Sequence, residues 1–543
     1  MNKIFLITAC IIFSLATKAQ PGKPPQSIDI NSTYKPVLRN AVKINLAGAQ
    51  LPADTSLPNL NYKIPSQNLF YSYRPISLKP LALEQDTNLY LGNRKFIKVG
   101  FGNFSTPYIS AGLSLGDGKT SLINFTGDYI QSKGTAIVNQ DYSQLNAKAA
   151  GSYFMPKSEF YGSFELNMHT YHLYGYDHSL YTFKKDSIKQ QFQNVTARAG
   201  YKNTKATETG ISYNPNIEIN LFTNKDKANE TNFIIDVPFE KVINDNFSAK
   251  LELKADITSY STKNVLPANI KLTNTIVQIN PAVNYHTDVI KIHAGITPAW
   301  NNNKYELLPD VYAELPVKDK VFSIQAGWIG RFVKNNYRNL SAINPYLSPV
   351  LFQINTKETE YYGGIKASVA KHLNFSAKAG LVQYKNLPFF INDTLANDKS
   401  FLISNETSVN NFRVHGDFGY INQDKFSLTG GITFNGYTSL NSNARAWHTI
   451  PVEVTGSLRW WAVKTVLIKS DVRFYDGSNY LAKGNVAKTL GGGTDLSAGV
   501  EFKVTKNISV WGDANNILNS KYERWHNYEV YGANFMGGVL IHF

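Results

Sequence analysis

Residues 248–257 read Ser-Ala-Lys-Leu-Glu-Leu-Lys-Ala-Asp-Ile, and polar and apolar side chains alternate through this stretch without a break. Leu251 and Leu253 fall on one face, whereas Lys250 and Glu252 fall on the other. A period of two is typical of a β-strand that has one apolar and one polar face. No stretch after the first 19 residues matches a helical period as well, so the sequence predicts an all-β fold.

The same alternation recurs along the chain as far as its last residue. Apolar faces of this kind occur in the following stretches: 322–328, 466–474 and 496–504. We expect about 22 strands between residues 96 and 543, an even number. Short turns join strands that follow one another in the sequence, so the predicted sheet is antiparallel.

Two architectures produce such strands, and the connections distinguish them. A soluble sandwich or propeller buries its apolar face in a core, whereas a transmembrane barrel turns it to lipid and keeps charged groups in the lumen. Short turns are expected at 116–119, 156–157, 203–205, 244–246, 317–319, 423–424 and 505–507, and long polar loops at 174–190, 261–273, 335–356, 386–409 and 476–488. Short turns at one rim and long loops at the other favour a single transmembrane antiparallel β-barrel over residues 95–543, with periplasmic turns and extracellular loops. Trp460-Trp461, Tyr361-Tyr362 and Trp525 fit aromatic girdles at the membrane interfaces, and the alternative for each is an ordinary packed aromatic.

Composition excludes several other classes of protein. Hydrophobic residues make up 43% of the chain, too many for a disordered protein. After the first 19 residues no run of about 18 apolar residues occurs, so a helical membrane bundle is excluded. Lys and Arg number 55 against 40 Asp and Glu, but they are dispersed without a basic stripe or reading motif. We therefore expect no nucleic-acid partner, and a lumen or rim that favours anions or anionic lipid headgroups.

Residues 1–19 are expected to be a secretory signal peptide. Lys3 precedes a short apolar run, and Thr17 and Ala19 place small residues at a cleavage site. Cys10 is the only cysteine of the chain and lies within this run. A lipoprotein cleavage box at Cys10 is the disfavoured alternative, because the apolar run continues beyond it. The mature chain then contains no disulfide, thiol nucleophile or Cys-based metal site.

The last strand carries a more specific signal. Counting back by two from Phe543 gives Ile541, Val539, Gly537 and Phe535, an almost wholly apolar face closed by an aromatic residue. This strand resembles the recognition strand that outer-membrane barrels present to their assembly machinery. The resemblance implies that this machinery is a partner of the chain.

The C-terminal 35 residues, roughly, resemble the end of TonB-dependent receptor barrels. The stretch 513–522 reads Asp-Ala-Asn-Asn-Ile-Leu-Asn-Ser-Lys-Tyr, and Gly532-Ala533-Asn534-Phe535 precedes the last strand. The family typically has Asn-Leu-Phe-Asn-x-x-Tyr, then Gly-Arg-x-Phe and a strand ending in Phe; Ala533 and Asn534 depart from this pattern. The resemblance implies a 22-strand barrel in the outer membrane of a Gram-negative-type bacterium.

Residues 20–94 depart from that family. TonB-dependent receptors carry a plug of well over a hundred residues before the barrel, whereas this segment is shorter, holds nine prolines and shows no convincing TonB box. We expect a Pro-rich, extended periplasmic segment and a plug-less barrel. Its aromatic end, Phe70–Pro75, would either enter the lumen, bind a periplasmic partner or remain a disordered leader.

Catalytic and metal-binding patterns are scarce. His169, His172, His178 and Asp177 lie close together in sequence, but His169 and His172 have opposite strand parity, which disfavours a loop metal site. Gly491–Gly493 lacks the Lys-Ser/Thr and the helix of a phosphate loop and is expected at a strand start. We therefore predict no enzyme, no catalytic, cofactor-binding or metal residues, and no cofactor.

Two functions follow from these expectations. The first is a passive or partner-gated solute transport channel. The alternative is a structural or docking subunit of an outer-membrane complex, with lipid and a periplasmic or surface protein as partners. The lumen of either barrel would have to be filled by folded-in loops, by residues 20–94 or by a partner.

Overall fold

The computed structural model describes residues 95–134, 137–263, 269–317, 321–369, 372–422 and 425–543. The expectations for the signal peptide at 1–19 and the segment 20–94 lie outside these residues. Of the two compact units into which the chain divides, only the one that contains the barrel is described here.

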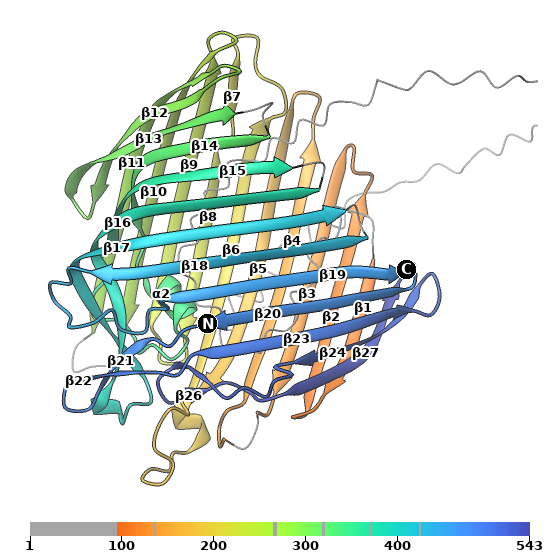
Figure 1. The fold of residues 1–543 in the computed structure, drawn as a ribbon, viewed down its shortest axis with the longest axis vertical. Coiled ribbons are helices and arrows are strands. Elements are labelled where there is room, and N and C mark those ends of the chain that lie inside the picture. The colour runs from red at the N-terminus through yellow and green to blue at the C-terminus, as the bar shows by residue number, and fades with distance from the viewer. Residues whose placement is uncertain (1–94, 135–136, 264–268, 318–320, 370–371, 423–424) are drawn as a thin grey trace, which may run out of the picture. The chain divides into compact units, whose positions relative to one another are not determined.

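Antiparallel β-strands form nearly the whole of the described chain (Figure 1). They are β1 (Phe96–Gly102), β2 (Thr106–Gly116), β3 (Ser121–Ser132), β4 (Tyr142–Phe154), β5 (Ser158–His172), β6 (Lys189–Asn203), β7 (Ile211–Tyr213), β8 (Asn216–Asn224), β9 (Asn229–Val242), β10 (Phe247–Thr262), β11 (Ile270–His286), β12 (Lys291–Asn301), β13 (Lys304–Val317), β14 (Phe322–Val333), β15 (Thr356–Val369), β16 (Leu373–Asn392), β17 (Phe401–Asn422), β18 (Phe426–Thr438), β19 (Val452–Val463), β20 (Val466–Tyr475), β21 (Asn479–Ala482), β22 (Val486–Thr489), β23 (Gly493–Lys503), β24 (Ile508–Asn515), β25 (Glu523–Trp525), β26 (Tyr528–Glu529) and β27 (Asn534–His542). The helices are η1 (Lys185–Ile188), α2 (Tyr337–Ile343) and η2 (Thr394–Ala396). Among the described residues no helix is long and apolar enough to cross a bilayer.

The sheet closes on itself, because the last strand β27 pairs with the first strand β1 from Phe96↔His542 to Gly102↔Met536. The sheet contains 23 strands in the described residues. β7 and β8 are two parts of one strand, since both pair with β9. The barrel therefore has 22 strand positions, which confirms the prediction of a closed antiparallel barrel.

Side chains alternate across the barrel wall as the sequence predicts. Leu251 and Leu253 point outward with 40% and 38% of their surface exposed, as do Trp328 and Val500. Asp471 points inward and is 8% exposed. The outer face is thus apolar, and the polar side chains line the lumen.

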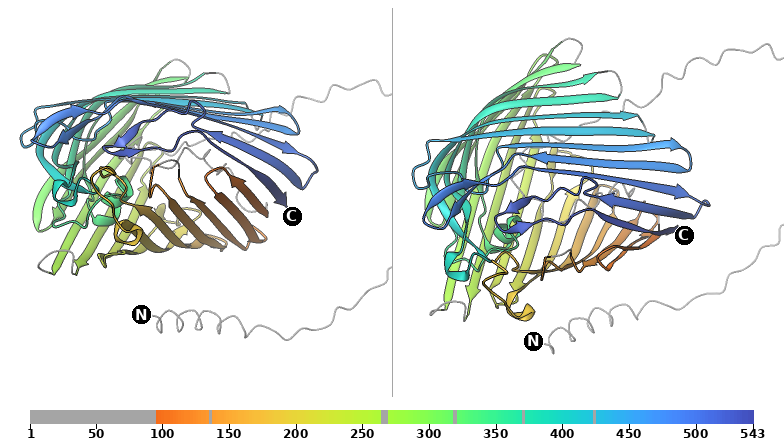
Figure 2. Two further views of the ribbon diagram at one scale, coloured as in Figure 1. Left: turned by 90° about the horizontal axis from the view of Figure 1, so that it is seen from below. Right: turned by 60° about the horizontal axis from the view of Figure 1, so that its bottom comes forward.

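The two rims of the barrel differ. We call the rim where β1 begins and β27 ends the terminal rim, and the opposite one the loop rim (Figure 2). Described connections at the terminal rim are short, at 117–120, 155–157, 204–210, 243–246, 287–290, 464–465 and 504–507. The long connections lie at the loop rim, at 173–188, 334–355, 439–451, 476–492 and 516–533, although the loop rim also has tight turns at 103–105, 225–228 and 302–303.

Two predictions about the loop rim are wrong. The expected long loop at 386–409 is mostly strand, because β16 and β17 continue in register from Leu387↔Glu406 to Asn392↔Phe401 and leave only residues 393–400 as a turn. Trp525 does not belong to an interfacial girdle: it is fully buried among the loops. Trp460 and Tyr361 do face outward, with 43% and 45% of their surface exposed.

Candidate functional site

Three loops of the loop rim, residues 173–188, 334–355 and 516–533, meet one another. They leave the wall at well-separated places, because eight, eight and six strand positions lie between them around the barrel. Segments that start so far apart on a ring can touch only inside it. Figure 2 shows these loops within the ring of strands.

The meeting point consists of three tyrosines, one from each loop. Tyr346 and Tyr528 stack with 3.5 Å between ring centroids. Tyr174 approaches Tyr528 edge-on at 4.8 Å and Tyr346 at 6.0 Å. All three rings are buried, and burial raises the pKa of Tyr528 well above its usual value, so its hydroxyl remains protonated. This hydroxyl donates a hydrogen bond to the carbonyl of Lys399.

We call the buried cluster around these tyrosines the aromatic lid. It comprises Ile130, Tyr142, Tyr171, Tyr174, Phe192, Phe222, Ala228, Tyr260, Tyr337, Leu340, Tyr346, Leu347, Val350, Phe390, Phe401, Trp525, Tyr528 and Tyr531. Trp525 lies 5.2 Å from the ring of Phe390 and 5.5 Å from that of Phe401. The extension of β16 and β17 beyond the expected rim therefore serves to deliver these two phenylalanines to the lid.

His448, in loop 439–451, joins the lid through Trp525, with ring centroids 5.4 Å apart. Its Nδ1–H donates to the carbonyl of Phe390 at 2.8 Å, so its Nε2 accepts from the backbone N–H of His526 at 3.3 Å. Burial lowers the pKa of His448 to about 4. The imidazole is therefore neutral at pH 7.

Loop 334–355 is fixed to the wall by the carboxylate of Glu230. One oxygen accepts from the backbone N–H of Tyr337 at 2.8 Å and from Nε2 of Gln353 at 3.0 Å. Glu230 is 2% exposed. Asn336 caps α2 by accepting from the N–H of Asn339, as expected for an N-cap asparagine. A buried charged acceptor thus ties the start of α2 to β9.

Further contacts hold the same loop in the lumen. The Nζ of Lys334 lies 3.1 Å from the carboxylate of Asp256 and donates to the carbonyl of Asn274 at 2.6 Å. Asn355 donates to the side chains of Asn274 at 2.6 Å and Asn301 at 2.8 Å. These wall partners come from β10, β11 and β12. The loop is therefore attached to the wall near both of its ends, at Lys334 and at Asn355.

The lumen wall beside the lid carries ion-pair networks. Arg413 contacts Glu358 at 3.2 Å and Glu360 at 2.9 Å. Arg331 binds the other oxygen of Glu358 at 2.8 Å, and Lys378 binds Glu360 at 2.8 Å. Other pairs are Arg459–Asp471, Lys469–Glu501, Arg473–Glu453 and Lys98–Asp513. Because inward lysines and arginines are matched by carboxylates, the expected anion preference of the lumen has no support here.

The histidines that the sequence placed close together have separate partners. His169 contacts Asn146 at 2.9 Å, His172 contacts the carbonyl of Asp141 at 3.1 Å, and His178 contacts the carbonyl of Tyr174 at 3.0 Å. Asp177 accepts from Ser179. Within the described ranges no group of three or more His, Cys, Asp or Glu could hold a metal ion. Gly493 begins β23, in agreement with the expected strand start.

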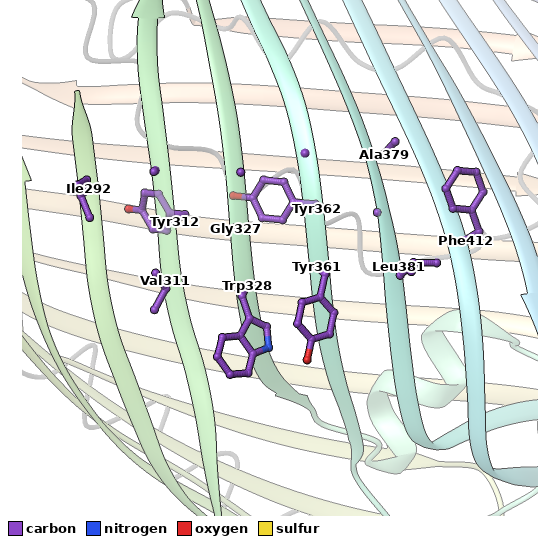
Figure 3. A pocket seen from close by; sticks show the side chains of 14 residues that line it. Ile292, Val311, Tyr312, Gly327, Trp328, Tyr361, Tyr362, Ala379, Leu381 and Phe412 are labelled. Carbon is purple, nitrogen blue, oxygen red and sulfur yellow. The ribbon is translucent and has the colours of Figure 1, made fainter. Parts of the chain in front are cut away.

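A shallow groove of about 630 Å³ lies on the outer face over β12–β17 (Figure 3). Ala313, Ala326, Gly363 and Ala379 are in register across four neighbouring strands and form its floor. Trp328 and Tyr361 stack beside it at 5.7 Å, as Figure 3 shows. The groove belongs to the apolar outer face and adds no chemical group to the lumen.

Sequence reasoning listed folded-in loops as one way to fill the lumen but did not identify the residues of the lid. The available signal was the density of tyrosine in two segments expected between strands: Tyr174, Tyr176 and Tyr181 in one, and Tyr528 and Tyr531 in the other. A solvated loop has no need for so many large rings, because exposed aromatic surface favours burial.

Comparisons with known proteins address the fold. No protein-family model and no curated protein matches the sequence. Similar solved structures include the FrpB iron transporter from Neisseria meningitidis (10% identity, TM-score 0.64, 83% of this chain and 81% of that one) and the copper transporter OprC (12%, 0.62, 83% and 80%). A third is the siderophore receptor PiuA from Acinetobacter baumannii (10%, 0.62, 83% and 82%). At these identities the likeness concerns the fold alone: the chain has a barrel of the same fold as these three proteins.

Proposed function

We propose that this protein is an outer-membrane transport barrel, with the terminal rim in the periplasm and the aromatic lid closing the external mouth. The observation that carries the proposal is a polar, charged lumen inside an apolar outer face, closed at one end by loops rather than filled by a hydrophobic core. The likeness to iron, copper and siderophore transporters supports the same class of function.

The solute would pass when the lid opens, either passively or on contact with a partner. The proposed membrane location implies two kinds of partner. Lipid surrounds the outer face, and the barrel assembly machinery binds the strand that ends in Phe543. The side chain of Phe543 is 63% exposed at the terminal rim, which leaves it accessible to such machinery. Enzymatic activity is not part of the proposal.

Single-channel conductance of the purified full-length protein in planar bilayers tests it. We expect rare, brief openings above a closed baseline, because the loops must separate before ions pass. A barrel that inserts into the bilayer and never conducts, even when the lid is weakened by mutation, would contradict transport. That result would favour the alternative of a structural or docking subunit, which the dense packing of the lid also fits.

A further inference from the structure

Lysines occupy a continuous run of positions on the terminal rim. Going round this rim through the β27–β1 seam, six consecutive positions each present one: Lys464, Lys506, Lys95, Lys119, Lys157 and Lys205. All except Lys95, which is half-buried, are exposed. Among the described residues, no ion pair joins any of the six to a carboxylate. We call them the lysine sector.

Past Lys205, the next two turns of the same rim have the opposite sign. Residues 243–246 contain Asp245 and residues 287–290 contain Asp288, and neither turn contains a lysine. Within the lysine sector the turns hold only two acids, Asp117 and Glu208. Asp117 is engaged in its own turn, where it accepts from three backbone N–H groups at 2.7–3.1 Å. Lys425, in the turn before Lys464, is exposed as well, so the positive charge extends beyond these six positions and is interrupted at the turns 243–246 and 287–290.

Outward-facing aromatic rings lie within four residues of these turns. Tyr153, Phe160, Tyr201, Trp460 and Phe502 are 38–52% exposed on the apolar outer face. Rings of this kind occupy the membrane interface, at the level of the lipid headgroups. Lys157, Lys205, Lys464 and Lys506 lie beyond these rings, toward the turns, which places their ammonium groups at the depth of the phosphates.

We propose that the lysine sector binds the headgroups of anionic phospholipids in the leaflet around the terminal rim. The proposal rests on the proposed membrane location. Lysine is a strongly hydrated point charge that pairs with phosphate without demanding one geometry, which suits fluid lipids. Several lysines beside an anionic surface act together. An acidic protein is the less favoured occupant, because the charges follow the circumference beside lipid-facing rings.

The experiment uses the full-length protein in bilayers of mixed phosphatidylethanolamine and phosphatidylglycerol. Spin-labelled lipids report, by electron paramagnetic resonance, the fraction held at the protein surface for each headgroup. We expect phosphatidylglycerol to associate about threefold more strongly than phosphatidylethanolamine at low salt, and this preference to fall in high salt. The variant K119Q/K157Q/K464Q/K506Q should bring the ratio close to one, whereas the matched variant K119R/K157R/K464R/K506R, which keeps the charge, should preserve it.

Each outcome has one meaning. A preference lost with Gln and kept with Arg supports the proposal. A surface-held fraction without any headgroup preference, or a preference that survives the Gln substitutions, overturns it and leaves the membrane location intact. No surface-held lipid of either kind would overturn the membrane location and this proposal with it.

Discussion

Tyr346 and Tyr528 stack at 3.5 Å although the loops that carry them leave the barrel wall eight strand positions apart. Neither ring has a second stacking partner at this distance among the described residues. The contact therefore bridges the interior of the barrel at the loop rim, through side chains that belong to the barrel's own loops. Removing either ring separates two loops that are otherwise anchored to different parts of the wall.

Tyr528→Ala is expected to open the lid. Loss of a buried aromatic side chain costs about 3–5 kcal/mol, and here the loss falls on loop contacts and not on the strand ladder. Single-channel recordings should show a higher open probability with an unchanged barrel fold. Tyr181→Ala, at a ring 37% exposed in loop 173–188, is the control and should conduct like the parent. Equal conductance of the parent protein, Tyr528→Ala and Tyr181→Ala would mean that the lid does not limit ion flow through the barrel.

Glu230→Gln should release loop 334–355. The change removes the charge from hydrogen bonds to Tyr337 and Gln353, which are worth about 1.5–3 kcal/mol when charged. Tryptic cleavage after Arg338, on α2, should then be at least about tenfold faster. Glu208→Gln, in an exposed turn of the terminal rim, provides the comparison. Unchanged cleavage after Arg338 would show that the carboxylate does not hold the loop.

Acid should weaken the lid through His448. Its pKa falls from 6.5 to about 4 in the folded state, so the unfolded state takes up the proton first. Neutral, buried His448 therefore stabilises the folded lid fully above pH 6.5. This stabilisation falls by about 1.4 kcal/mol per pH unit as the pH falls from 6.5 to 4. Open probability should rise over this window. His448→Asn should remove the dependence, and a variant that kept it would assign the effect to another group.

Leu253→Arg tests the outward face of β10. Placed near the middle of the bilayer, the new charge should cost about 2–4 kcal/mol. Glu252→Arg introduces the same residue one position away, on the lumen side, and should cost far less. Urea unfolding in lipid vesicles measures both. Equal losses at the two positions would contradict the membrane-facing assignment of this strand.

The strands and the two faces of the wall could be predicted because a period of two is a local property of the chain. Leu253 and Glu252 illustrate this, since their assignment needs no distant contact. The path of a loop, in contrast, depends on contacts with residues that are distant in the sequence. The segment 386–409 contains Pro, Asn and Asp and reads as a polar loop, yet Phe389 and Phe390 extend β16 because their burial stabilises pairing beyond the rim.

The lid could not be placed from the sequence for the same reason. Trp525 near a strand end has the position of a girdle residue, and only its contacts with Phe390 and Phe401, more than a hundred residues earlier, bury it. In the sequence, the wall side chains that fix loop 334–355 look like any other lumen residues, because only the folded position of α2 gives them their partners. Periodicity identifies the face on which Glu230 lies but not its partner.

The seam between β1 and β27 determines when the barrel can be completed. Asn103 beside β1 donates to the carbonyl of Ala533, 430 residues later. At the seam the backbones approach so closely that a side-chain carbon on Gly538 would clash with the carbonyl oxygen of Val99. Until the final strand has paired with β1, both edges of the sheet carry unpaired backbone groups that invite pairing with other chains. The barrel therefore cannot close without its final strand, and we expect a chain interrupted before Gly538 to form an open, aggregation-prone sheet.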